Sequence, residues 1–215
     1  MAIAATIDRT KHDVFRWRYE LSVPWKIALS LGIALLVGAL AQVRIALPFT
    51  PVPITGQTFG VLLAAVLMGR LWGGVSLAIY AGLGFAGVPW FSGLASGFGA
   101  TGGYIIGFVL AALFLGHFTD TYIRSRSFLS MLVLMLFANF ILIHIPGLIW
   151  LGVWINVIKG SPTTLVALLA MGMTPFIIGD VIKAVAAAAI VRGVTPKSAY
   201  NGEVDKDKWA NWRIP

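Results

Sequence analysis

Residues 174–192 read TPFIIGDVIKAVAAAAIVR, an almost wholly apolar stretch that is long enough for about 28 Å of α-helix, close to the thickness of a bilayer core. Asp180 and Lys183 interrupt it three residues apart, so a helix would carry both side chains on one face. A lone charge in hydrocarbon is costly, whereas two opposite charges partly neutralise each other. The stretch therefore predicts a membrane-spanning helix whose charged face points at a protein interior. Either a ligand site or a structural ion pair between helices would account for the two charges.

The composition of the 215-residue chain extends this prediction to the rest of the sequence. Hydrophobic residues make up 59% of the chain and charged residues only 11%, whereas soluble domains carry about 25% charged residues. The net charge is +8, but Lys and Arg gather at the ends of apolar runs rather than in a patch with stacking aromatic residues. We therefore expect an all-α integral membrane protein that binds the lipid bilayer and no nucleic acid. Cysteine is absent and the three histidines lack metal-ligand spacing, so we expect no metal and no cofactor.

Proline, glycine and charged residues divide the apolar sequence into six expected membrane helices. Their ranges are 25–47, 58–67, 74–83, 104–118, 128–157 and 174–192. Pro146 and Gly147 should bend or break the fifth helix. Ala39-Leu40-Ala41 loosely resembles a signal-peptide cleavage site, but the preceding polar segment is long and contains acids, so we interpret the first run as a membrane helix. The expected domains are a basic arm (1–26), a six-helix membrane domain (27–192) and a basic tail (193–215).

Positive charge is distributed unevenly between the two sides of such a bundle. Six helices place both termini on the same side of the membrane. Thirteen Lys and Arg residues fall on that side, in the arm, the tail and two connections between helices, against only Arg44 and Lys159 on the other side. Cytoplasmic segments carry the excess of Lys and Arg, so both termini are predicted to be cytoplasmic in the cell membrane.

Two unusual connections fall on the opposite, outer side. Residues 47–58 contain three prolines yet remain apolar, which predicts a loop folded into the protein. Residues 82–103 contain eight glycines and no charge, which is typical of a flexible lid rather than a phosphate-binding loop. Together with Asp180 and Lys183 they predict an outward-facing small-molecule pocket, in which Lys183 attracts a polar oxygen and Asp180 accepts from ligand N–H groups or holds Lys183. His144 is expected to be a hydrogen-bonded packing residue.

Four motifs of this sequence resemble those of the BioY family, the biotin-binding S components of energy-coupling factor (ECF) vitamin transporters. The motifs are PVPITGQT (51–58), GVPWF (87–91), TGGYIIGF (101–108) and PFIIGDVIK (175–183). The resemblance implies a six-helix subunit that captures biotin from outside. It also implies two kinds of partner, a transmembrane coupling subunit and a pair of cytoplasmic ATPases.

The same resemblance assigns candidate residues. It places the ligand on Asp180 and Lys183 and on the loop residues Phe91, Ser92 and Gly93, with Thr55, Gln57 and Tyr104 as further pocket positions. Small residues of the first helix would contact the coupling subunit, in some pairing of Ala28, Gly32, Ala34 and Gly38. The sequence departs from the family pattern at Trp90, at residues 92–96 and at Ala100.

Two other classes of function compete with this interpretation. A self-sufficient proton-coupled carrier of a small carboxylate would use Asp180, with or without His144, but there is no inverted repeat and there are few buried titratable groups. An intramembrane enzyme would use Ser92 or Ser96 as nucleophile, but neither has a recognisable base, and Asp180 has no carboxylate partner. We therefore expect a transport protein and not an enzyme.

Overall fold

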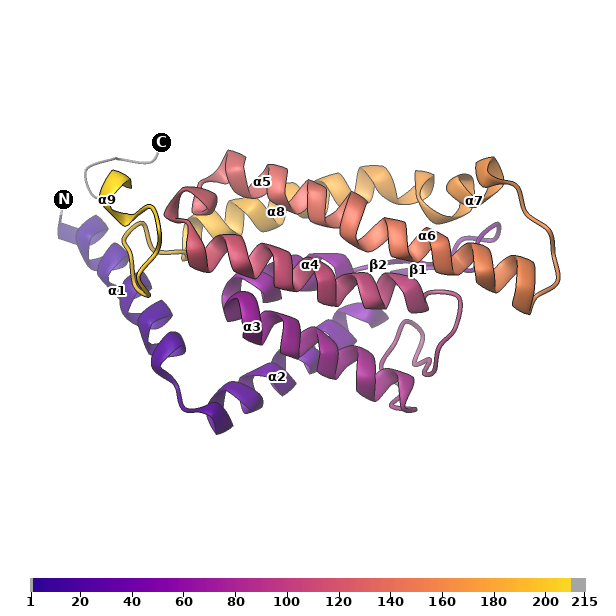
Figure 1. Cartoon of the computed structure of the whole chain (residues 1–215), viewed down its shortest axis with the longest axis horizontal. Helices are drawn as coiled ribbons and strands as arrows, with labels where there is room; N and C mark the ends of the chain where they lie inside the picture. Colours follow the sequence, from indigo (N-terminus) through magenta and orange to yellow (C-terminus); the bar gives the residue numbers. More distant parts are fainter. Residues whose placement is uncertain (1, 210–215) are drawn as a thin grey trace.

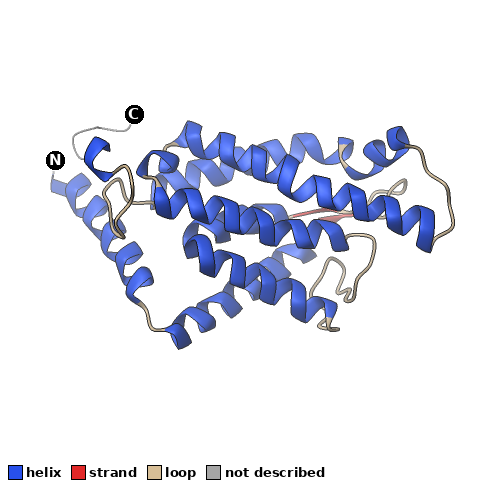
Figure 2. Cartoon of the chain, viewed as in Figure 1, coloured by secondary structure: helices blue, strands red, loops and turns tan. Residues whose placement is uncertain are grey.

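The computed structural model describes residues 2–209, most of which are helical (Figure 2). The part of the predicted tail beyond residue 209 lies outside the described residues. Within the described part, five helical stretches are long and apolar enough to cross a membrane: Val23–Gln42, Gln57–Phe85, Gly102–Thr121, Phe128–Ile158 and Leu165–Val194. This confirms the prediction of a mainly helical membrane protein.

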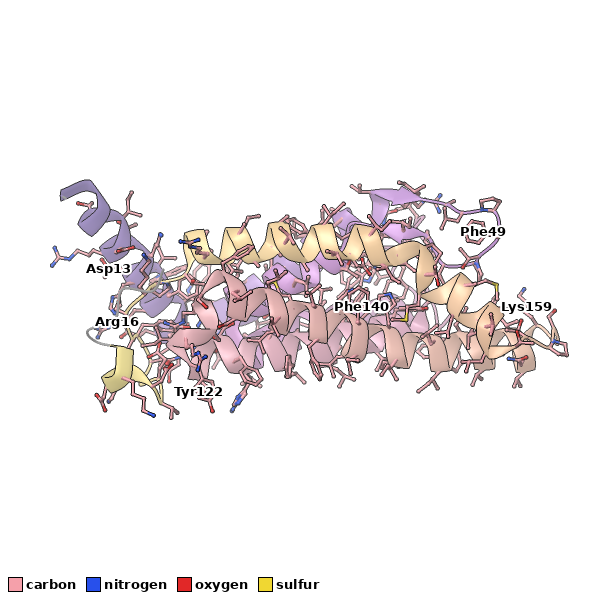
Figure 3. The ribbon with its side chains drawn as sticks, turned by 90° about the horizontal axis from the view of Figure 1, so that it is seen from above. Asp13, Arg16, Phe49, Tyr122, Phe140 and Lys159 are labelled. Carbon is pink, nitrogen blue, oxygen red and sulfur yellow. The ribbon has the colours of Figure 1, made fainter. Side chains whose placement is uncertain are left out.

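Most of the helices run lengthwise beside one another, whereas the first helix, at one end of the molecule, is tilted away from them (Figure 1). The bounds are α1 Ala2–Glu20, α2 Val23–Gln42, α3 Gln57–Phe85, α4 Gly102–Thr121, α5 Phe128–Phe137, α6 His144–Val153, α7 Leu165–Gly172, α8 Ile177–Val194 and α9 Lys206–Trp209. Helix α4 packs against both α3 and α6, while α5 packs against α8. We call the end that carries α1 and α9 the terminal end and the opposite end, where Figure 3 shows Phe49 and Lys159, the loop end.

Helix α3 is a helical hairpin rather than one straight helix. Gly69 has the non-helical backbone angles φ +77° and ψ −175°, a conformation that glycine adopts without steric cost. The side chain of Gln57 donates to the Tyr80 hydroxyl over 2.6 Å, although 23 residues of straight helix would separate them by about 35 Å. The chain therefore folds back at Gly69 into two helices, which lie close to the predicted ranges 58–67 and 74–83.

The hairpin turn is held by two charged side chains from other elements. Arg18 of α1 donates to the carbonyl oxygens of Val66 (3.3 Å) and Leu67 (3.0 Å), which end the first helix without helical partners. Asp120 at the end of α4 accepts from the backbone N–H of Arg70 (2.9 Å), which begins the second helix. Backbone groups that the turn leaves unpaired are thus satisfied.

The first membrane helix ends at Gln42 and not near residue 47, so that expected boundary was wrong. The chain instead forms a short antiparallel pair of strands, β1 (Arg44–Ile45) and β2 (Ile54–Thr55), with Arg44 opposite Thr55. The Pro-rich loop lies between the two strands. The strand pairing satisfies backbone groups that the prolines exclude from a helix.

Pro146 does not break the fifth helix, so the break expected as one of two outcomes at Pro146-Gly147 does not occur. A π-helical turn, Ala138–Ile143, connects α5 to α6 immediately before it, and the helix continues to a second π-helical turn, Trp154–Ile158. Proline lacks an N–H and its ring collides with the carbonyl four residues earlier, here Leu142. Because Leu142 lies within the wider π-helical turn, the chain accommodates the proline without ending the helix.

Five side chains at the terminal end form a cluster, buried at three of them and half-buried at Asp120 and Tyr200, that we call the terminal clasp: Arg18, Asp120, Arg126, Tyr200 and Glu203. Arg18 pairs with Asp120 at 3.0 Å, and Arg126 pairs with Glu203 in full burial. The Tyr200 hydroxyl donates to Asp120 over 2.8 Å. Burial raises the pKa of Tyr200 well above its usual range, so the hydroxyl stays protonated and remains a donor. The clasp fastens the C-terminal segment to α1 and α4.

Candidate ligand-binding site

A small cavity of about 50 Å³ lies between the Pro-rich loop, α4, α6 and α8. We call it the inner cavity. Its polar lining includes six of the eight ligand residues expected from the sequence: Thr55, Gln57, Ser92, Tyr104, Asp180 and Lys183. The structure thus brings together residues from four separate parts of the chain.

Asp180 and Lys183 form an ion pair on the wall of the inner cavity. Lys183 Nζ lies 2.9 Å from Asp180 Oδ1, and only 3% of the Asp180 side chain is exposed, against 20% for Lys183. Lys183 also donates to Thr58 Oγ1 over 3.0 Å. Asp180 lies in the first turn of α8, where the N-terminal end of the helix dipole favours a negative charge.

Three further partners of Asp180 were not assigned to the site from the sequence, and one of them is Thr58, whose hydroxyl donates to Asp180 Oδ1 over 3.3 Å. Asn139 donates from Nδ2 to Asp180 Oδ2 over 2.9 Å, and His144 Nε2 lies 3.5 Å from the same oxygen. Asn139 sits in the π-helical turn Ala138–Ile143, and its own carbonyl oxygen lies 2.9 Å from His144 Nδ1. A single amide inside a strongly apolar helix was the signal that could have identified Asn139. His144 is hydrogen-bonded as expected, and it also lines the cavity.

The cluster around Asp180 retains unused hydrogen-bonding capacity. Asn139 Oδ1 and Ser92 Oγ are buried and have no hydrogen-bond partner among the described residues. Lys183 carries three N–H donors and uses two of them, on Asp180 and Thr58. Buried polar groups are normally satisfied, so two orphan oxygens and a spare donor indicate a place where a ligand binds.

Three other predicted pocket residues use their polar atoms within the protein. Gln57 Oε1 accepts from Thr55 Oγ1 over 3.0 Å, and its amide nitrogen bonds to Tyr80 as described above. The Tyr104 hydroxyl donates to the Gly172 carbonyl oxygen over 2.7 Å. These residues therefore build the cavity wall and fix the elements around it.

The Gly-rich loop covers 86–101, because α3 continues to Phe85 and α4 begins at Gly102. Phe91 is buried against the rings of Tyr80 (5.3 Å between centroids) and Phe85 (5.5 Å), and it does not line the inner cavity. It lines a second cavity of about 270 Å³, the outer cavity, between the Pro-rich and Gly-rich loops. The two cavities share the lining residues Pro53, Ser92 and Thr101.

Arg44 is the charged residue of the outer cavity, and sequence reasoning did not assign it to the site. Its guanidinium lies against Gly93, where an added Cβ would come within 2.3 Å of Nη1. Gly93 itself lines neither cavity. Among the described residues Arg44 has no ion-pair partner, so its donors are free to meet an anion.

Three side chains tie the Gly-rich loop to the helices. Gln42 donates to the carbonyl oxygens of Trp90 (3.2 Å) and Phe91 (3.1 Å) and accepts from the backbone N–H of Leu94 (3.1 Å). Trp150 donates to the Gly99 carbonyl oxygen over 2.8 Å. Trp90, which departs from the family pattern, has its own structural role, since its indole N–H donates to the backbone of α3 at Tyr80 over 3.0 Å. The last residue before the TGGYIIGF motif, Ala100, lines the outer cavity.

The four small residues of α2 do not share one face. Ala34 and Gly38 are buried inside the molecule, and a Cβ added to Gly38 would lie 3.3 Å from Trp90. Ala28 and Gly32 are exposed, with nothing within 4 Å of a Cβ added to Gly32. Of the four residues, Ala28 and Gly32 are therefore the pair that this structure leaves exposed for a partner.

Sequence comparisons agree on one family. The family model for the BioY family matches residues 14–200. A probable biotin transporter BioY from Methanothermobacter thermautotrophicus is 50% identical over 157 residues, which cover 71% of this chain and 100% of that protein. The biotin transporter BioY of Thermotoga maritima is 33% identical over 150 residues, 68% of this chain and 82% of that protein.

The fold also has a counterpart among solved structures. The S-component for biotin from an ECF-type ABC transporter superposes with a TM-score of 0.68 at 26% sequence identity. The match covers 80% of this chain and 93% of the other. The likeness therefore extends over most of this chain.

Proposed function

The chain belongs to the BioY family, and we propose that it is the membrane subunit that captures biotin for an ECF transporter. It is a component of a transporter and not an enzyme, and it is a multi-pass membrane protein. The observation that carries the proposal is the Asp180–Lys183 pair, buried on a cavity with spare donors and acceptors. A self-sufficient proton-coupled carrier is not favoured, since the similar sequence is a probable biotin transporter BioY and the similar structure is the S-component for biotin of an ECF-type ABC transporter.

Biotin has two polar ends, and the inner cavity suits its ureido group. That group offers two N–H donors and one carbonyl acceptor. The inner cavity supplies complementary groups: the orphan oxygens of Asn139 and Ser92 and the spare donor of Lys183. A carboxylate carries only acceptors and would face the buried charge of Asp180. We therefore orient the ureido ring toward α8.

The carboxylate of biotin then reaches the outer cavity, which is lined by Arg44, a residue without an acidic partner among the described residues. A guanidinium binds a carboxylate through two parallel hydrogen bonds. Phe91 and the prolines of the facing loop supply apolar surface for the aliphatic chain between the two ends. Because Gly93 has no Cβ, the Arg44 guanidinium can lie against it.

Capture requires the Gly-rich loop to move. Small-molecule pockets enclose roughly 300–1,000 Å³. The inner cavity of about 50 Å³ is far below that range, whereas the inner and outer cavities together reach its lower end. Ser92 and Thr101 lie on the boundary between them, so displacement of residues 88–100 joins the two into one site and admits the ligand.

We further propose six membrane spans with both termini in the cytoplasm. The α3 hairpin supports two short spans, 57–68 and 70–85, where one long helix would give a single span. Arg16 belongs to the basic arm and lies at the terminal end, whereas Lys159, one of the two basic residues expected on the outer side, lies at the loop end (Figure 3). The two cavities then open to the outside. A reporter-fusion map of both termini and of the 159–164 loop tests this topology.

ATP-driven transport requires partners, because the sequence carries no nucleotide-binding motif. We propose that a transmembrane coupling subunit and a pair of cytoplasmic ATPases supply the energy. Ala28 and Gly32 are the exposed small residues of α2, which let another helix approach closely. Replacing Gly32 with Leu should prevent co-purification with the coupling subunit while leaving biotin binding intact.

The first experiment is calorimetric titration of biotin into the detergent-purified chain and into Lys183→Ala. Tight one-to-one binding that collapses in the variant supports the proposed substrate and site. Absence of binding by well-folded wild-type protein contradicts the proposal. The orientation is tested by titrating biotin methyl ester into wild type and Arg44→Gln: the preference for biotin over its ester should be lost in Arg44→Gln. A preference that persists in Arg44→Gln but disappears in Lys183→Ala would reverse the orientation.

A further inference from the structure

A third cavity, of about 500 Å³, lies at the terminal end and shares no lining residue with the inner and outer cavities. We call it the terminal cavity. Its walls are the end of α1, the first turns of α2, the turn of the α3 hairpin, the end of α4 and residues 201–204. The lining joins charged residues to the apolar side chains Leu29, Leu71 and Trp72. A cavity of this mixed character needs a different ligand from that of the inner cavity.

The acidic residues of the terminal cavity are already neutralised. Asp120 is paired with Arg18, and Glu203 is paired with Arg126 and accepts from two backbone N–H groups, those of Tyr200 and Asn201. No charge from these two carboxylates is left to balance additional cations.

Two cations of the terminal cavity remain without an acid. Lys26 donates to the Tyr19 carbonyl oxygen over 2.8 Å, and Arg70 Nη1 lies 3.3 Å from His117 Nδ1. Neither pairs with a carboxylate anywhere in residues 2–209. Arg70 is exposed and Lys26 half-buried, so both are accessible to an anion. The cavity therefore carries uncompensated positive charge.

The apolar lining of the terminal cavity begins beside Lys26 and Arg70 and continues along the apolar helices α2 and α3. Lys26 lies in the first turn of the apolar helix α2, and Leu29 follows one turn deeper. On the facing hairpin, Leu71 is 60% exposed and Trp72 lies beside it. Basic residues with Trp at the end of a membrane helix mark the headgroup level of the bilayer. Positive charge at the mouth and apolar surface below match the shape of a phospholipid.

We propose that the terminal cavity binds an anionic phospholipid from the adjoining leaflet. Its phosphate contacts Lys26 and Arg70, and an acyl chain lies along Leu29, Leu71 and Trp72. Basic pockets between membrane helices attract anionic headgroups through the same chemistry. The lipid links the start of α2 to the hairpin turn of α3, two elements that meet at this cavity.

Native mass spectrometry of the full chain in detergent tests the proposal. The protein is titrated with phosphatidylglycerol or with phosphatidylcholine of the same acyl chains. Wild type should retain phosphatidylglycerol preferentially, and Lys26→Gln/Arg70→Gln should lower that retention roughly tenfold or more. The matched control Arg9→Gln/Lys197→Gln removes two exposed charges outside the cavity and should retain the lipid as wild type does. Unchanged biotin affinity shows that the variants are folded.

The competing occupants give different outcomes. Equal retention of the two lipids by the wild-type protein overturns the proposal and leaves the coupling protein as the occupant. This outcome does not depend on the folding of any variant. Displacement of phosphatidylglycerol by millimolar inorganic phosphate overturns it in favour of a simple anion site. Retention by Lys26→Gln/Arg70→Gln equal to that of wild type also overturns it.

Discussion

Two buried ion pairs, one on the inner cavity and one in the terminal clasp, differ in how fully their polar atoms are used. Arg126 and Glu203 are 2% and 0% exposed, and backbone groups satisfy the atoms that do not face each other: Arg126 donates to the carbonyl oxygens of Thr119, Pro196 and Ser198. Asp180 is as deeply buried, but Lys183 is 20% exposed to the cavity and keeps a free donor. Asn139 beside it keeps a free acceptor.

The difference teaches that burial of charge alone does not identify a binding site. A fully satisfied polar network fixes a structure, because each group would lose partners if the network opened. A network with orphan groups on a cavity has capacity that only another molecule can use. The terminal clasp is of the first kind and the Asp180 cluster of the second, so the same substitution should affect stability in one and affinity in the other.

The largest expected effect is on stability, in Glu203→Gln. The substitution leaves Arg126 buried without its carboxylate, which should cost about 4 kcal/mol of unfolding free energy. Unfolding by titration with sodium dodecyl sulfate in mixed micelles measures the change. Glu20→Gln is the matched control, because Glu20 pairs with Arg16 on an exposed helix face and should leave stability nearly unchanged. Loss of biotin affinity in folded Glu203→Gln would contradict the separation of the two clusters.

Asp180→Asn should show the opposite pattern. It removes the charge that neutralises Lys183 and leaves one acceptor oxygen in place of the two that Lys183 and Asn139 now use, and we expect biotin affinity to fall by about 3 kcal/mol, roughly 150-fold. Stability should fall less than in Glu203→Gln, since Lys183 can turn toward the cavity. Asp205→Asn is a suitable control: its carboxylate accepts from the backbone of Ile123 and Arg124 at the terminal end, so affinity should not change. Equal losses of affinity in both variants would show that the loss is not local.

Much of the fold was predictable because hydropathy and glycine act locally. The apolar runs indicated the helices, and Gly69 with Arg70 indicated the turn that the structure forms. The strand pair at Arg44 was not predictable, since two-residue strands carry no periodic pattern. The π-helical turn before Pro146 depends on how α5 and α6 pack around α4, which no local pattern records.

The site was predictable to the extent that unusual residues stand out in an apolar sequence. Asp180 and Lys183 were visible as charges in a membrane helix, Gln57 through a family motif, and Ser92 through the loop that the family resemblance implied. Asn139 and Arg44 were missed because each stands alone in its segment and joins the site only through tertiary contacts. The terminal clasp was missed for the same reason, since its members come from α1, α4, the connection after α4 and the tail.

A smaller effect should follow from loosening the cover of the ligand site. Gln42→Ala removes the three hydrogen bonds that tie α2 to the Gly-rich loop. We expect a loss of about 1 to 1.5 kcal/mol in biotin affinity, roughly five- to tenfold, because the closed loop becomes less populated. Proteolysis within residues 88–100 should be faster in the variant and slower with biotin. Asn156→Ala, an amide that bonds a different loop, serves as control. Unaltered proteolysis of Gln42→Ala would mean that other contacts hold the loop.

The smallest expected effect is a dependence of stability on pH that arises from Tyr200 in the terminal clasp and that the ligand site should not share. Burial raises the pKa of Tyr200 above the unfolded value of about 10, so the folded state holds this proton more tightly. The contribution of this proton to the free energy of unfolding is complete below pH 10 and is lost as the pH rises above that value. Between pH 9 and pH 10.5 the free energy of unfolding should therefore fall by roughly 0.8 kcal/mol. Tyr200→Phe loses the hydrogen bond to Asp120 at every pH but should lack this additional decline. Unfolding titrations at the two pH values measure the difference, and equal declines in wild type and Tyr200→Phe would assign the alkaline sensitivity to other groups. Biotin affinity should be the same in both proteins at neutral pH, because the clasp and the ligand site share no side chain.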